Sequence, residues 1–128
     1  TNPSLHRKQS QISPKDYFRE IEMFFELRQY RTQPGQRDNW VRFMEEVIIP
    51  FQVGKGMVIV GSFVGEQEQD LYVWIRRFES ESERERLYEA VYQSDEWLNK
   101  IGPKIPEMMV PGKAVVTRIE PTAISVIH

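Results

Sequence analysis

Two segments of the chain carry arginine among aromatic residues, at a spacing of two. Glu26, Arg28 and Tyr30 alternate in the first segment, and Trp74 and Arg76 alternate in the second. Alternate residues of a β-strand lie on one face, so each segment would present its polar and aromatic groups on the same side. A guanidinium beside aromatic rings suits either a surface that contacts a ligand or a buried ion pair.

A third segment near the C-terminus adds Arg118, which shares a face with Glu120 if that segment is also a strand. The candidate site is therefore Glu26, Arg28, Tyr30, Trp74, Arg76 and Arg118. In one interpretation, Glu26 or Glu120 neutralises the arginines in an ion-pair network that fixes the register of the sheet or of a dimer. In the other, the arginines hold an anionic or carbonyl-bearing small molecule between apolar walls. Three arginines against two acids leave one cation without a partner.

Other kinds of site find little support in the sequence. The chain has no cysteine, which excludes disulfides, thiolate nucleophiles and zinc–cysteine sites. Its two histidines, His6 and His128, lie near the ends, where no core element would hold a haem ligand or the base of a serine nucleophile. The stretch 54–56, Gly-Lys-Gly, is too short for a phosphate loop. We therefore expect no metal site and no cofactor.

Length and charge exclude further classes. The 128 residues suit one domain with its own core. A formal net charge of −2 gives no basic field for nucleic acid, so we expect no nucleic-acid partner. No apolar run approaches the roughly 20 residues of a membrane-spanning helix. Together with the absence of cysteine, this favours a cytoplasmic protein, or one of the mitochondrial matrix if the source is a eukaryote.

The positions of these residues depend on the elements that carry them. Residues 1–20 are polar and predict a flexible arm or a tag remnant, and residues 21–128 predict a single domain. Strands are predicted at 23–30, 57–64, 72–79 and 114–120. A helix follows Pro34-Gly35 and should end or kink at Pro50.

A second helix should begin at a capping box formed by Ser82 and Glu85. A shorter one should begin at Ser94 and stop at Gly102-Pro103, before a mostly irregular stretch.

The predicted order is strand, helix, strand, strand, helix, strand. This is the βαββαβ order of an α+β, ferredoxin-like domain with an antiparallel sheet. We expect the first and third strands to be central, parallel neighbours, which would bring Arg28 and Arg76 together. The helices can cover only one face of such a sheet, so the other face must meet something, most simply a second copy of the chain.

Six ordered blocks of the chain resemble the NIPSNAP family. They are residues 26–30, Pro34-Gly35 before Trp40, residues 49–51 leading to 57–63, residues 74–79, residues 94–97, and residues 118–121. The resemblance covers roughly residues 22–121. It implies a dimeric α/β barrel, in which two ferredoxin-like protomers pack their sheets face to face with the helices outside.

The resemblance implies less about activity, because it brings no catalytic motif to copy onto this chain. We expect a homodimer that binds a small organic molecule, anionic or not, in a pocket between sheet and helices. One alternative is a cofactor-independent monooxygenase, a function found among proteins that share the barrel. Another is a protein-interaction module without a ligand.

Overall fold

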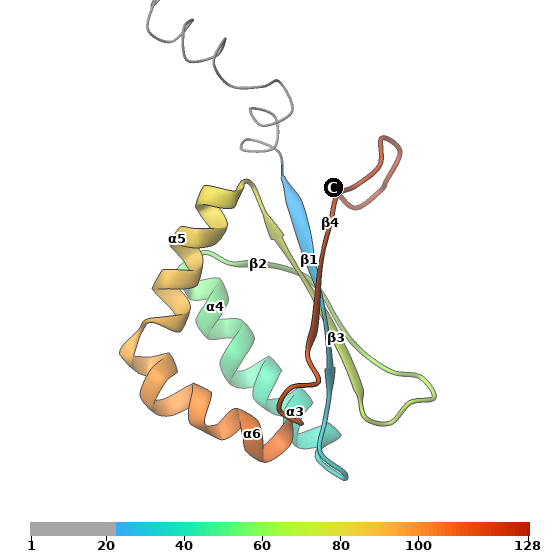
Figure 1. Ribbon diagram of the computed structural model, residues 1–128, viewed down its shortest axis with the longest axis vertical. Coiled ribbons are helices and arrows are strands. Elements are labelled where there is room, and N and C mark those ends of the chain that lie inside the picture. Colours follow the sequence, from blue (N-terminus) through green and yellow to red (C-terminus); the bar gives the residue numbers. More distant parts are fainter. Residues whose placement is uncertain (1–22) are drawn as a thin grey trace, which may run out of the picture.

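The computed structural model describes residues 23–128, so the arm expected at residues 1–20 lies outside the described part of the chain. The described elements, in chain order, are β1 (Phe24–Arg31), α3 (Arg37–Phe43), the π-helical turn η1 (Met44–Ile48), α4 (Ile49–Lys55), β2 (Val58–Val64), β3 (Leu71–Phe78), α5 (Glu81–Tyr92), the π-helical turn η2 (Trp97–Ile101), the 3-10 turn η3 (Gly102–Lys104), α6 (Ile105–Met108) and β4 (Val115–Ile119) (Figure 1). The βαββαβ order expected from the sequence is confirmed.

The four strands form one sheet in the order β2-β3-β1-β4. β1 lies antiparallel to both β3 and β4, with Glu26 opposite Arg76 on one side and opposite Arg118 on the other. The expected parallel pairing of the first and third strands is therefore wrong. The reason is the connection: β3 returns from β2 through the short Gly65–Asp70 loop and inserts between β2 and β1, so it runs against both.

The helices all lie on one face of this sheet (Figure 1). Even-numbered residues of β1 and β3 face them, and the alternation in β3 is complete, with every even residue from Tyr72 to Phe78 buried. Two apolar clusters fill the space between the layers. The larger one gathers Tyr30, Trp40, Met44, Ile48, Tyr72, Trp74 and Ile101, and the smaller one gathers Phe24, Met57, Phe78, Leu87 and Val91.

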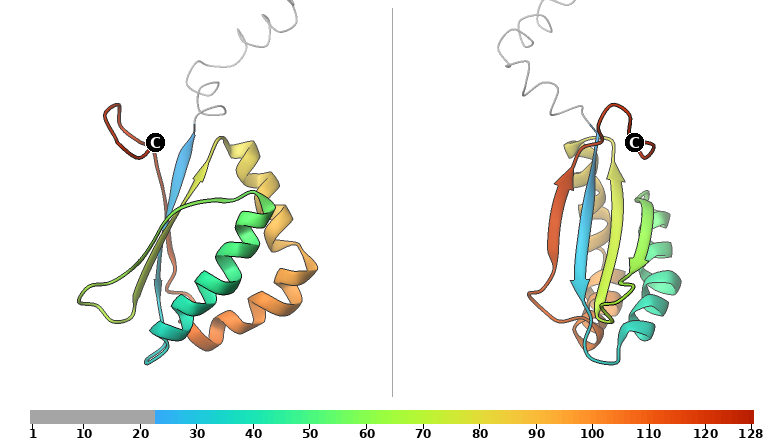
Figure 2. Two further views of the ribbon diagram at one scale, coloured as in Figure 1. Left: turned by 180° about the vertical axis from the view of Figure 1, so that it is seen from behind. Right: turned by 90° about the vertical axis from the view of Figure 1, so that its right-hand side faces the viewer.

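The opposite face of the sheet is not covered by any described helix. The right-hand view of Figure 2 looks onto this face, with β4, β1, β3 and β2 side by side and the helices behind them. Its odd-numbered residues include Phe63, Val115 and Ile119, which are exposed apolar side chains. The tail after β4 borders one end of the face, where Pro121 and Ile127 lie near Phe25.

Pro50 does not end the first helical segment, contrary to one of the two outcomes expected. The chain stays helical to Lys55. The helix is capped by Gly56, which adopts a left-handed conformation with φ of 112°. The wider π-helical turn η1 comes immediately before Pro50. A wider turn accommodates the proline ring, which would clash with the preceding turn of a regular α-helix.

The second helical region, from α5 to α6, begins and ends at other residues than the sequence predicts. The cap of α5 is Ser80, whose Oγ accepts a hydrogen bond from the backbone N–H of Glu83 at 3.1 Å, so the cap lies two residues before the predicted one. Ser94 does cap the next segment, since its Oγ accepts from the N–H of Trp97 at 3.1 Å. Helical structure then continues through Gly102-Pro103 to Met108 instead of stopping.

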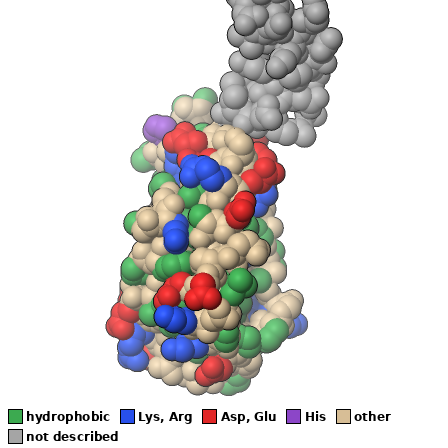
Figure 3. All heavy atoms as spheres, turned by 90° about the vertical axis from the view of Figure 1, so that its left-hand side faces the viewer, with side chains coloured by type: hydrophobic (Ala, Val, Ile, Leu, Met, Phe, Trp, Pro, Cys, Tyr) green, Lys and Arg blue, Asp and Glu red, His purple; other side chains and the backbone are tan. Residues whose placement is uncertain are grey.

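The outer surface of the helix layer is polar and mixed in charge (Figure 3). Acidic and basic side chains alternate there, as in the ion pairs Arg84–Glu81 and Lys100–Glu96. This view of the molecule gives no large field of one sign that would favour a strongly charged partner. Among residues 23–128, no helix has both the length and the apolar character needed to cross a bilayer.

Candidate ligand-binding site

Arg76, in the middle of β3, is completely buried beneath the helices. One terminal nitrogen donates to Gln52 Oε1 at 2.8 Å and to the Tyr92 hydroxyl at 2.7 Å. The other donates to Glu26 Oε1 at 2.7 Å and to the Tyr88 hydroxyl at 2.8 Å. A buried guanidinium is stable only when it has a counter-ion and hydrogen-bond acceptors. Here β1, α4 and α5 together supply acceptors for both terminal nitrogens.

Aromatic rings complete the surroundings of Arg76. Its guanidinium carbon lies 4.8 Å from the Trp74 ring centre and 5.7 Å from that of Phe78, its neighbours on the same face of β3. The rings of Tyr88 and Tyr92 lie at 5.1 and 5.8 Å. The negative faces of these rings favour a cation, so the cluster holds Arg76 in one place.

Glu26 is the counter-ion of Arg76 and is itself 3% exposed. Burial alone would raise the pKa of Glu26, but the charge of Arg76 and the hydrogen bonds from Tyr88 and Arg76 outweigh it and hold that pKa below its ordinary value. Tyr88 donates to Glu26 Oε2 at 2.5 Å. Burial raises the pKa of Tyr88 to about 12, so this hydroxyl keeps its proton at neutral pH.

Arg28, on β1, is a second guanidinium on the same carboxylate. One terminal nitrogen lies 3.4 Å from Glu26 Oε1 and 3.2 Å from the Tyr88 hydroxyl. Arg76 lies closer to the same carboxylate oxygen, at 2.7 Å. Its Nε donates to the Tyr30 hydroxyl at 2.7 Å. Two cations therefore share one acid, and Arg76 makes the shorter contact.

Arg118 does not join this group, although it lies opposite Glu26 in the register of β1 and β4. Its side chain is about half exposed and forms an ion pair with Glu81 at the start of α5. Its guanidinium carbon lies 3.6 Å from the centre of the Phe24 ring. The structure therefore brings together Glu26, Arg28, Tyr30, Trp74 and Arg76 and places Arg118 outside.

A cavity of about 140 Å³ lies beside Arg28, between the sheet and the helices. It is lined by Arg28, Tyr30, Trp40, Met44, Ile48, Trp74, Tyr92, Trp97, Ile105 and Met109. These residues come from β1 and β3 and from both helical regions, and all three tryptophans of the chain are among them. An engineered apolar cavity of about 150 Å³ holds a benzene molecule, so this volume suits a ring-sized apolar body.

The cavity wall contains polar hydrogens that no described residue accepts. The indole N–H groups of Trp40 and Trp74 are buried and have no hydrogen-bond partner among residues 23–128. The hydroxyl oxygens of Tyr30 and Tyr92 accept from Arg28 and Arg76, but no acceptor in the described chain takes their own protons. Most buried donors in proteins are paired, so the unpaired hydroxyl protons of these two lining tyrosines favour a ligand that accepts hydrogen bonds.

Three contributors to the site were not in the predicted set: Gln52, Tyr88 and Tyr92. Tyr88 and Tyr92 stand four residues apart on α5 and so point from one helix face toward the sheet. That spacing is visible in the sequence and was the available signal. Gln52 offers no such pattern, because it lies beyond Pro50, where the helix was expected to end or kink.

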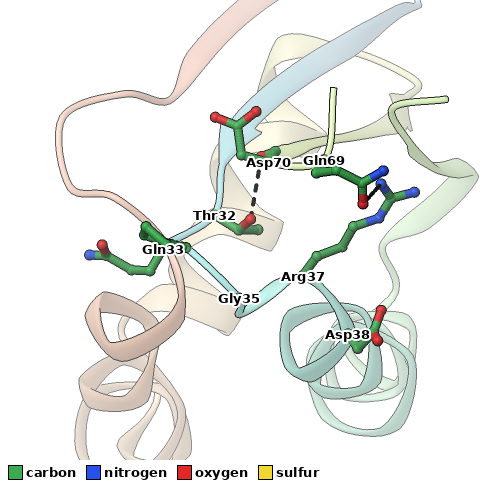
Figure 4. A pocket seen from close by; sticks show the side chains of 8 residues that line it. Thr32, Gln33, Gly35, Arg37, Asp38, Gln69 and Asp70 are labelled. Carbon is green, nitrogen blue, oxygen red and sulfur yellow. Dashed lines mark hydrogen bonds between the residues drawn. The ribbon is translucent and has the colours of Figure 1, made fainter. Parts of the chain in front are cut away.

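A second hollow, of about 240 Å³, lies where β1 ends and the β2–β3 loop turns (Figure 4). Its polar groups are paired with one another: Arg37 donates to Gln69 at 3.2 Å, and the N–H of Thr32 donates to the carbonyl of Asp70 at 2.8 Å. Arg37 and the acids Asp38 and Asp70 all line this hollow, so it lacks the unanswered positive charge of the inner cavity. It is the weaker candidate for a ligand site.

Metal chemistry was not expected from the sequence. In the part of the chain that the structure describes, no three His, Asp or Glu side chains gather in the way metal ligands do.

Solved structures with a similar fold include three proteins described as NIPSNAP or NIPSNAP-like. A NIPSNAP family protein of unknown function from Agrobacterium tumefaciens is 25% identical, with a TM-score of 0.75 over 84% of this chain and 96% of that one. A NIPSNAP-like domain protein from Burkholderia xenovorans is 19% identical, with a TM-score of 0.73 over 82% and 90%. A second Agrobacterium tumefaciens NIPSNAP family protein is 19% identical, with a TM-score of 0.71 over 81% and 90%.

A search of curated proteins found no match to this chain. The sequence profile of the NIPSNAP family, in contrast, matches residues 25–119, which span every described strand but the first residue of β1. The resemblance noted in the sequence is confirmed, and the chain belongs to the NIPSNAP family.

Proposed function

We propose that this protein binds a small organic molecule in the cavity between the sheet and the helices. The observation that carries the proposal is the cavity wall, in which Arg28 and the tyrosines Tyr30 and Tyr92 lie among aromatic and aliphatic side chains. Ligand pockets in proteins have this character: mostly apolar, with a few polar groups that fix orientation.

Thermal unfolding tests this proposal with benzoate, benzamide and benzyl alcohol as ring-sized probes. Binding to the folded state raises the melting temperature. We expect at least one probe to raise it for the wild type and for Leu98→Phe, whose side chain is exposed and outside the cavity lining. The same probe should have no effect on Ile105→Phe, because Ile105 lines the cavity and the larger ring fills part of it. An equal response from both variants, or none from the wild type, would contradict the proposal.

The exposed sheet face supports a second part of the function, assembly as a homodimer. The odd-numbered residues of β1, β3 and β4 meet there with residues of β2 that include Val58 and Phe63, and Val58, Phe63, Val115 and Ile119 remain exposed. Contiguous apolar patches of this kind on a sheet are usually interaction sites. The family resemblance implies a second copy with its sheet packed on this one. Light scattering during size exclusion should therefore report about twice the mass of one chain.

A further inference from the structure

We infer that the ligand of the inner cavity is a monocarboxylic acid with a ring-sized apolar body, held through its carboxylate by Arg28. This inference rests on the proposed function and names the chemical class of its ligand. Its starting point is the charge of the buried cluster. Glu26 is one anion, Arg28 and Arg76 are two cations, and no other acidic side chain of the described residues lies in ion-pair contact with these three.

The hydrogen bonds show which of the two arginines is left for a ligand. Arg76 is fully buried, both of its terminal nitrogens are engaged, and it does not line the cavity. Arg28 is 18% exposed, lines the cavity, and has one terminal nitrogen that bonds to no described residue. Glu26 makes its shorter contacts with Arg76 and Tyr88, at 2.7 and 2.5 Å, and lies 3.4 Å from Arg28.

The other polar groups of the lining select for an acceptor. Arg28, Tyr30 and Tyr92 all carry hydrogens that can be donated, and no acidic side chain lines the cavity. The free terminal nitrogen of Arg28 can donate a charge-assisted hydrogen bond to a carboxylate. A carboxylate accepts at several positions and donates none, so it matches this set, whereas a cationic ligand would meet an unopposed positive charge.

The remaining wall sets the body of the ligand. Met44 and Ile48 from η1 and Trp40 from α3 are buried side chains with no charge. They would enclose an apolar ring or a branched chain of similar size, and the cavity volume of about 140 Å³ leaves little room for more. Simple aromatic acids such as benzoate have this shape and are the natural probes.

Calorimetric titration with benzoate and with benzamide tests the inference, because the two probes share a shape and differ in charge. A hydrogen bond to a charged group contributes roughly 1.5–3 kcal/mol, so we expect the wild type to bind benzoate about tenfold or more tightly than benzamide. Arg28→Met should remove this preference, because benzoate loses its charged partner. Arg118→Met, the matched control, should keep it, since Arg118 lies outside the cavity and pairs with Glu81.

The outcomes separate the inference from the proposed function. If benzamide binds as tightly as benzoate, or if Arg28→Met keeps the preference for benzoate, the assignment of a carboxylate is overturned while binding in the cavity stands. If neither these two nor benzyl alcohol binds the wild type, the proposed function falls with it. Circular dichroism of each variant establishes that the fold is intact, and Arg28→Lys, which keeps the charge without the planar fork, should retain part of the preference.

Discussion

Glu26 and Arg76 form an ion pair of 2.7 Å across the two central strands, and both side chains are almost completely excluded from solvent. The pair joins β1 to β3 at directly opposed positions. Arg76 also donates hydrogen bonds to Tyr88 and Tyr92 of α5 and to Gln52 of α4. It therefore ties the helix layer to the sheet. Arg28 lies farther from the same acid, at 3.4 Å, and it is the arginine of this cluster that lines the cavity.

Removal of the buried cation should strongly destabilise the fold. Arg76→Met leaves Glu26 buried with Arg28, at the longer distance, as its only charged partner, and breaking a buried pair costs about 3–5 kcal/mol. The double variant Glu26→Gln/Arg76→Met should be more stable than the sum of the two single changes implies, because it leaves no buried carboxylate without its main cation. Urea denaturation measures both, and strictly additive losses would show that the two residues are not coupled.

Removal of Arg28 should have a much smaller effect on stability. The variant Arg28→Met keeps the apolar stem, leaves the Glu26–Arg76 pair intact and removes a like charge from its vicinity, at the loss of the hydrogen bond to Tyr30. We expect the free energy of unfolding to change by less than about 1.5 kcal/mol. A loss as large as that of Arg76→Met in the same urea series would assign Arg28 to the structural network and remove the argument for its role in binding.

The stability of the protein should fall in acid partly because of Glu26. Its folded-state pKa lies below the ordinary value of 4.5, so between the two values the unfolded chain binds more protons than the folded one. The stabilisation is then complete above about pH 4.5 and is lost as the pH falls through the lower, folded-state pKa.

The difference in unfolding free energy between wild type and Glu26→Gln should accordingly shrink from pH 7 to pH 3. Glu66→Gln, at an exposed position of the β2–β3 loop, is the control and should give no such trend. A wild-type advantage over Glu26→Gln that is constant across this range would contradict an ionised Glu26.

Two neighbouring serines should differ in their contribution to α5. Ser80 accepts from the N–H of Glu83, so Ser80→Ala should cost about 0.5–2 kcal/mol, the usual range for loss of an N-cap. Ser82 lies within the exposed first turn, and Ser82→Ala should change stability by less than about 0.5 kcal/mol. Equal losses in thermal or urea unfolding would contradict the cap assigned to Ser80.

A charge on the open sheet face should dissociate the proposed dimer. Phe63→Glu places a carboxylate at an exposed apolar position of β2, where a partner sheet would bury it. Val53→Glu makes a similar change at an equally exposed position of α4, outside that face. Light scattering should report the mass of one chain for Phe63→Glu and of two for Val53→Glu, whereas identical masses would place the interface elsewhere or exclude it.

Alternation along the strands carried most of the fold prediction. The period of two in Phe24 to Tyr30 and in Tyr72 to Phe78 is plain in the sequence, and it correctly places Glu26, Arg28, Trp74 and Arg76 on one face. Parity says nothing about strand direction, which is why β1 and β3 were correctly expected to be neighbours but wrongly expected to be parallel. Direction follows from the order in which connections cross the sheet.

Side-chain direction and helix ends were harder to predict. Arg118 has the parity of the cluster, but its long side chain turns to Glu81, and that acid's position depends on how α5 packs. Similarly, the helix passes Pro50 because a π-helical turn forms just before it, and no periodicity marks such a turn in advance. This continuation brings Gln52 to Arg76, so the mistake about the helix end also hid a residue of the site.

The tryptophans provide the most direct test of a ligand site in this cavity. Trp40, Trp74 and Trp97 all line it, and they are the only tryptophans in the chain. In ¹H–¹⁵N spectra each gives one indole N–H signal, and titration with benzoate should move these signals in a saturable way, because the three rings line the cavity. Indole signals that stay fixed through titrations with benzoate, benzamide and benzyl alcohol would contradict a binding site between the sheet and the helices.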